Sequence, residues 1–184
     1  MTAPTGLTWE QYAALCAPVS ADRIARDPRG NSHLEQWDVR RHLIRIFGFG
    51  GWDFELLEST LVKEIQHPPR RRKDRNDQEY GDPYTPWTVL YRVTGRLTIH
   101  PQGAVLAVYE DGATGDSENQ PSLGGAHDQA FKTAISQALK RCAVNLGDQF
   151  GLSLYADTQK AVVLSSLVAP KAPLTKEPKP DGTS

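Results

Sequence analysis

Apolar side chains recur at helical spacing in the segment 33–47, and this pattern predicts an amphipathic helix. The residues that share its apolar face are Leu34, Trp37, Leu43, Ile44 and Phe47. Ser32 precedes the segment as a candidate N-cap, with Glu35 at the capping-box position. Gly48 follows it and is the predicted end of the helix.

Three later segments have the pattern of strands. Residues 54–66 form the first, and residues 87–99 alternate between apolar and polar positions, which is typical of a half-buried strand. The side chains predicted to face one way in the second strand are Trp87, Val89, Tyr91, Val93, Leu97 and Ile99. A short turn at 101–103 leads to a third strand at 104–110, so the spacing predicts an antiparallel meander.

A long helix is predicted over about 125–147, ending near Gly147. Small side chains recur on it every four residues, at Ala126, Ala130, Ala134, Ala138 and Cys142. Such a ridge lets another element approach closely. A last short helix is predicted from about 155 to 167. Helix, three strands and helix together predict an α+β domain over residues 1–167, with a three-stranded antiparallel meander before the long helix.

Three stretches interrupt these patterns. Prolines and charges over 67–86 predict a long loop at a hairpin tip, and residues 111–125 resemble a turn-rich connection. Residues 168–184 contain four prolines and no aromatic residue. A stretch of this composition buries too little surface to offset chain entropy, so we expect a disordered tail rich in proline and lysine.

The charge balance narrows the range of functions. The 184 residues include 21 Lys and Arg against 22 Asp and Glu, which excludes a generally basic DNA coat but allows a locally basic groove. Cys16 and Cys142 form no C-x-x-C pair, so a zinc ribbon or a disulfide framework is not indicated. With no signal peptide and no apolar run of membrane length, we expect a soluble cytoplasmic protein that has no membrane partner.

Motifs for nucleotide or covalent chemistry are missing from the sequence. There is no P-loop, no G-x-S-x-G and no H-E-x-x-H, so we predict no catalytic residue, no cofactor and no metal site. One alternative stays open. An acidic cluster could hold Mg²⁺ for phosphodiester cleavage by a nuclease, although a solvated turn is the more common reason for such a cluster. Its members are Glu110, Asp111, Asp116 and Glu118.

Basic residues gather on three separate segments. The predicted first helix carries Arg40, Arg41 and Arg45. The central loop carries Arg70, Arg71, Arg72, Lys73 and Arg75. The long helix carries Lys140 and Arg141, facing away from its small-residue ridge. Any one run is typical of a solvated face, but together, with Phe49 and Trp52 available to stack on bases, they favour nucleic-acid binding.

Two segments in order resemble one family, the Rad-fifty-two family of single-strand annealing proteins. The first, SHLEQWDVRRHLIRIFGFGGWDFEL at 32–56, runs from a helix into an F-G-F-G-G-W motif. The second, AFKTAISQALKRCAVNLGDQFGLSLY at 130–155, has the family's A-L-K-R core. Between them, YEDGATGDSE at 109–118 resembles the family's E-D-x-G-x-G-x-S-E stretch. The resemblance covers about residues 19–160.

The resemblance implies a fold and an activity. It implies a β-β-β-α core, assembly into a homo-oligomeric ring, and a basic groove that binds single-stranded DNA. It also implies annealing of complementary strands without ATP or covalent chemistry, in homologous recombination and double-strand break repair. Lys140 and Arg141 align with the pair at the groove floor, and Phe49 aligns with an aromatic residue there.

Two positions depart from the family pattern. Asp38 and Val144 stand where the family has arginines that contact DNA, and Arg40, Arg41 or Arg45 could substitute for them. The basic loop at 67–86 has no counterpart that aligns, and it is a candidate second, outer DNA site.

Alternatives to the annealing function stay open at this point. The chain could be a mediator that binds DNA ends without annealing, the nuclease described above, or a structural oligomer whose basic loop binds an acidic protein. The brevity of the chain favours a phage protein over a bacterial one. Expected partners are a phage exonuclease or a host single-strand-binding protein, in the cytoplasm or nucleoid of a bacterial host.

Overall fold

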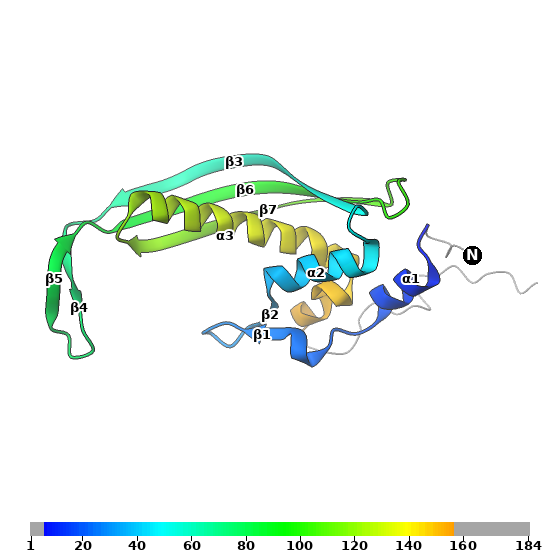
Figure 1. Ribbon diagram of the computed structural model, residues 1–184, viewed down its shortest axis with the longest axis horizontal. Helices are drawn as coiled ribbons and strands as arrows, with labels where there is room; N and C mark the ends of the chain where they lie inside the picture. Colours follow the sequence, from blue (N-terminus) through cyan, green and yellow to red (C-terminus); the bar gives the residue numbers. More distant parts are fainter. Residues whose placement is uncertain (1–5, 157–184) are drawn as a thin grey trace, which may run out of the picture.

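The computed structural model describes residues 6–156 (Figure 1). Its helices and strands are α1 (Trp9–Cys16), β1 (Ile24–Arg26), β2 (Ser32–Leu34), α2 (Gln36–Phe47), β3 (Trp52–Gln66), β4 (Arg70–Lys73), β5 (Glu79–Tyr84), β6 (Trp87–Ile99), β7 (Ala107–Gln120) and α3 (Leu123–Ala143). Short 3-10 helices follow α1 and α3: η1 (Ala21–Arg23), η2 (Val144–Leu146), η3 (Asp148–Phe150) and η4 (Leu152–Ala156). No helix in this part of the chain has both the length and the apolar character needed to span a bilayer.

The centre of the molecule is a three-stranded antiparallel sheet with α3 lying along one face (Figure 1). The strand order is β3-β6-β7, with Trp52 opposite Ile99 and Ile99 opposite Ala107. On β6 the side chains of Val89, Val93 and Leu97 are fully or almost fully buried, because they point toward α3. The predicted α+β class, with antiparallel strands before a long helix, is confirmed.

The small-residue ridge of α3 explains how closely the helix approaches the sheet. All five ridge residues are completely buried: Ala126, Ala130, Ala134, Ala138 and Cys142. A Cβ added at Gly115 of β7 would lie 2.2 Å from the backbone nitrogen of Ala134, so only glycine fits there. The ridge predicted from sequence therefore packs within the subunit, against β6 and β7.

The prediction for residues 111–125 is wrong. The third strand continues as β7 to Gln120, although its sequence, DGATGDSENQ, is typical of turns. The register along β6 is continuous from Ile99 opposite Ala107 to Val89 opposite Ser117. Two of the glycines allow close packing rather than chain reversal, because a Cβ at Gly112 or Gly115 would meet a neighbouring backbone within 3.2 Å.

The central segment is also better ordered than a loop. Between β3 and β6 the chain forms a two-stranded hairpin, with Arg72 opposite Tyr80 and Lys73 opposite Glu79. The carboxylate of Asp74 accepts the backbone N–H groups of Asn76 and Gln78, which closes the turn. Figure 1 shows the hairpin bending away from the end of the sheet. The predicted long loop is therefore a β4–β5 hairpin.

The start of the first predicted helix is also corrected. Ser32 does not cap α2 but pairs with Arg26 in a small β1–β2 sheet, and the N-cap is Glu35, without a side-chain capping bond. Leu34 belongs to β2, and Trp37 is 60% exposed rather than on the apolar face. At the other end Gly48 closes the helix with φ +89°, as predicted.

The main apolar core lies where α2 meets the ends of β6 and α3. Its fully buried members include Leu43 of α2, Leu97 and Ile99 of β6, and Leu139 and Cys142 of α3. α1 packs over this core through Tyr12. Cys16 and Cys142 are free thiols.

After α3 the chain continues in short 3-10 helices. Gly147, the predicted end of the long helix, has φ +105° in this segment. The expected helix at 155–167 begins inside η4, and the rest of it lies outside the described residues, as does the tail at 168–184.

Candidate nucleic-acid interface

Lys140 lies in the last turn of α3, beside the small β1–β2 sheet. It lines a cleft of about 150 Å³ together with Ser32, His33 and Leu34 of β2. Burial lowers the pKa of the Lys140 ammonium, and the nearby carboxylate of Glu35 opposes that shift. An ammonium that has lost part of its hydration is a favourable partner for a phosphate oxygen entering the cleft.

Arg141 follows on the same turn but is exposed. Its Nε donates to Oδ1 of Asp111 on β7, 3.0 Å away. It also lines a shallow hollow with Arg92 of β6 and Gln137 of α3. Lys140 and Arg141, the two cations predicted at the groove floor, thus lie on the solvent-facing side of α3. The opposite side of the helix is buried against the sheet.

The arginines of α2 are held differently from one another. Arg41 donates to Oδ1 of Asp38 at 2.6 Å, and its guanidinium carbon lies 5.0 Å from the ring centre of Trp37. Arg45 is exposed on the same side of the helix, and Arg40 is half-buried.

Asp38 occupies one of the positions where the family resemblance leads one to expect an arginine. Its side chain is only 2% exposed, and it accepts from Nε of Arg23 at 2.9 Å. Arg23 is itself 5% exposed and also donates to the side chain and backbone carbonyl of Gln149, at 2.7 and 2.8 Å. The position therefore joins the N-terminal segment, α2 and η3, and does not face a ligand.

His42 completes the surroundings of Asp38. Its Nδ1 lies 3.0 Å from the backbone carbonyl oxygen of Asp38, and the ring is buried. Burial lowers the pKa of His42, so the imidazole is held neutral near pH 7. Sequence reasoning gave no role to Arg23, because a lone arginine outside a predicted element carries no signal of burial.

The F-G-F-G-G-W motif makes the sharp exit from α2 into β3. A Cβ at Gly51 would lie 1.9 Å from the carbonyl oxygen of Phe47, so the turn requires glycine. Phe49 stands 91% exposed at this turn. Trp52 is instead packed against the main core, so of the two predicted stacking residues only Phe49 is open to a base.

The basic residues of the hairpin are all exposed: Arg70, Arg71, Arg72, Lys73 and Arg75. Lys73 pairs with Asp77 at 2.9 Å, and Nε of Arg70 donates to the hydroxyl of Tyr84 at 3.2 Å. Four carboxylates share residues 67–86 with the five cations, which leaves a net charge of only +1. The acidic residues are Asp74, Asp77, Glu79 and Asp82.

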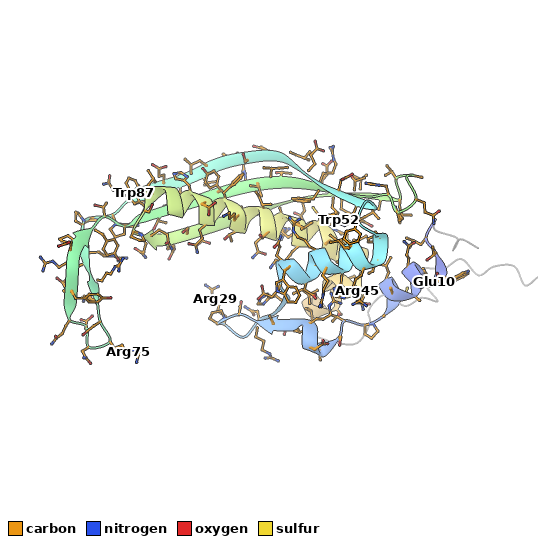
Figure 2. All side chains as sticks on the ribbon, viewed as in Figure 1. Glu10, Arg29, Arg45, Trp52, Arg75 and Trp87 are labelled. Carbon is orange, nitrogen blue, oxygen red and sulfur yellow. The ribbon has the colours of Figure 1, made fainter. Side chains whose placement is uncertain are left out.

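These sites fall into two regions. Figure 2 shows Arg75 at the tip of the β4–β5 hairpin, well separated from Arg45 on α2. Lys140 and Arg141 belong with α2, because Glu35 and Gln36 at the start of α2 line the same hollow as Lys140. The structure thus brings together the cations of α2 and α3 and leaves the hairpin apart.

The acidic cluster does not form a metal site. Asp111 lies on the α3 face of β7, whereas Glu110, Asp116 and Glu118 alternate onto the other face. Glu110 pairs with Arg96 at 2.7 Å, and Asp111 pairs with Arg141. Within residues 6–156 no group of three or more His, Cys, Asp or Glu side chains is placed to hold a metal ion. The geometry therefore does not support the nuclease alternative.

Comparisons with known proteins agree with the sequence resemblance. Residues 13–172 match the family described as "Rad52/22 family double-strand break repair protein". The chain is also 26% identical over 133 residues to the "DNA repair and recombination protein RAD52" of Eremothecium gossypii. That match covers 72% of this chain but 26% of the relative, so the chain spans about a quarter of its relative's length. Because the family match runs from α1 through α3 and beyond, this chain belongs to the Rad52/22 family of double-strand break repair proteins.

Proposed function

We propose that the chain binds single-stranded DNA and anneals complementary strands without ATP, in DNA recombination and double-strand break repair. The observation that carries this proposal is the placement of Lys140 and Arg141. They lie on the solvent-facing side of α3, beside α2, while the small-residue ridge of the same helix is buried against the sheet. Family membership supports the proposal, because the matched family is described as double-strand break repair proteins.

The chemistry of annealing needs no catalytic group. Cations that bind phosphates leave the base edges free for pairing, and such contacts carry no sequence information. Binding gains from counterion release, so affinity falls as salt rises. Assembly into a ring would repeat one modest site many times, and avidity would then replace tight single contacts.

The β4–β5 hairpin serves, in this proposal, as a second DNA contact. Its arginines are exposed and lie far from α2, so they would meet a different stretch of strand. The small net charge of the hairpin makes this the weaker of the two surfaces. The host setting, a phage or bacterial cell, and partnership with an exonuclease or a single-strand-binding protein belong to the same proposal.

The test is an ATP-free annealing assay with two complementary labelled oligonucleotides. Lys140→Ala with Arg141→Ala should reduce strand binding and annealing at least tenfold, because the double change removes two phosphate-binding cations, and the reduction should be similar for unrelated sequences. Lys63→Ala is the matched control, since Lys63 is an exposed lysine of β3 whose partner Leu90 lies on the face of the sheet away from α3. Melting temperature and assembled mass should stay unchanged. Normal annealing by the double variant would contradict the assignment of this surface.

A further inference from the structure

One side of α2 carries an unusual exposed series. Trp37, Arg41, Arg45 and Phe49 follow one another at intervals of four residues, with Phe49 two residues past the end of the helix. Trp37 is 60% exposed and Phe49 is 91% exposed. Because residues four apart lie on the same side of a helix, Trp37, Arg41 and Arg45 form an exposed α2 ridge, and Phe49 is a further exposed aromatic residue in the turn just past the end of the helix.

The Trp37–Arg41 pair is held in place. The Arg41 guanidinium lies over the Trp37 ring at 5.0 Å and also donates to Asp38 at 2.6 Å. Asp38 is fixed in turn by the buried Arg23. A planar cation with such an anchor restrains the indole that it contacts, while the 60% exposure of Trp37 leaves ring surface open to a ligand.

The charge around the ridge indicates a polyanion. The single acidic residue of α2 is Asp38, and it is buried in ion pairs. Arg41 and Arg45 also line a hollow of about 510 Å³ beside the helix, with Asp22 as its one carboxylate. Exposed aromatic rings next to arginines are the combination that binds single strands, by stacking on bases and pairing with phosphates.

The α2 ridge also begins near Lys140, one of the two residues proposed to bind phosphates. Gln36, the neighbour of Trp37, lines a hollow together with Lys140 of α3. Trp37 follows Gln36 directly, so the ridge begins at the residue next to this shared hollow.

We propose that Trp37, braced by Arg41, is a base-stacking site for single-stranded DNA. The proposal rests on the proposed function and extends it from phosphate contacts to contacts with base faces. A base held by its face keeps its pairing edge free, so stacking at Trp37 orders the strand without hindering a complementary strand. The site accepts every base, because every base has a face that can stack.

The experiment compares two single-stranded probes, an oligothymidylate and an oligomer of equal length in which abasic sugars replace the bases. The parent should bind the oligothymidylate more tightly. Trp37→Ala should weaken oligothymidylate binding about tenfold and leave abasic binding nearly unchanged, while Trp37→Phe should retain part of the difference. Trp9→Ala is the matched control, because Trp9 is a 50% exposed tryptophan on α1, and it should change neither affinity.

Other outcomes overturn the proposal. Unchanged oligothymidylate binding by Trp37→Ala would do so, and so would equally weakened binding of both probes, which would place the effect in the fold or in phosphate binding. A change in assembled mass by light scattering, with the preference for bases retained, would make Trp37 a contact between copies. If the parent binds neither probe, the proposed function itself fails together with this site.

Discussion

The two arginine-rich regions of this protein have similar compositions but different physical settings. In the region of α2 and the end of α3, Arg41 is anchored on the buried Asp38, and Lys140 is partly enclosed in a cleft. In the β4–β5 hairpin the cations are exposed, and Lys73 pairs with an exposed carboxylate. The comparison indicates that a run of basic residues in the sequence does not distinguish cations held in place by the fold from solvated ones. What distinguishes them is the buried structure beneath.

The largest expected effect comes from breaking the anchor beneath α2. Asp38→Ala leaves the buried guanidinium of Arg23 without its carboxylate partner, which should cost about 3–5 kcal/mol of unfolding free energy. The matched change in the hairpin, Asp77→Asn, removes the charge of the exposed partner of Lys73, keeps a side chain that tolerates the positive φ of +63° at this position, and should cost less than about 1 kcal/mol. Urea unfolding of both variants measures the difference. Similar destabilisation by the two changes would show that the anchored and solvated regions do not differ as described.

A smaller effect should come from the packing that holds Lys140 and Arg141 in place. Ala138→Leu inserts a larger side chain where α3 lies against the sheet, and it should cost about 1–3 kcal/mol. Lys132→Leu enlarges nothing buried, because Lys132 is exposed, and should change stability by about 0.5 kcal/mol or less. Thermal unfolding and assembled mass are the readouts. A melting temperature equal to the parent's for Ala138→Leu would show that α3 does not pack tightly against the sheet at this position.

The smallest effect on stability should come from the hairpin. Replacing Arg70, Arg71, Arg72, Lys73 and Arg75 with serine should leave melting and assembly nearly unchanged, since none of these side chains is buried. The salt dependence of single-strand binding should still fall, by about 0.7 in the log–log slope for each phosphate that the hairpin no longer neutralises. Fluorescence anisotropy titrations at several salt concentrations measure the slope. An unchanged slope would make the hairpin a solvated charge run.

Regular packing was predictable from sequence, whereas departures from regularity were not. The alternation on β6 and the four-residue repeat on α3 report burial directly, and both predictions are confirmed. The sequence pattern does not indicate the full length of β7, because its glycines resemble turn residues and the contact that requires Gly115 is made by a helix later in the chain. The sequence pattern places Trp37 on the apolar face together with Leu34, because it predicts a helix that begins before Gln36.

The sequence indicates the cations of the candidate site, but it does not indicate the buried ion pairs that hold some of them in place. A short motif predicts Lys140 and Arg141 as DNA contacts, and the structure places them on the open side of α3. The sequence around Asp38 and around Arg23 does not indicate a buried ion pair, because each residue alone resembles an ordinary surface charge. Such a pair can be recognised only in the folded structure, where segments distant in sequence lie side by side.

The bond between Arg23 and Gln149 has a consequence for the order in which the molecule forms. The two residues are 126 positions apart in sequence, so this bond waits until nearly all of the described chain has been synthesised. The β6–β7 pairing and the packing of α3 on β7 join neighbours in sequence and close much shorter loops, and short loops form faster. We therefore expect the sheet and α3 to form early and the α2 ridge to be fixed last. A nascent chain would then complete its folded scaffold before its proposed DNA-binding surface.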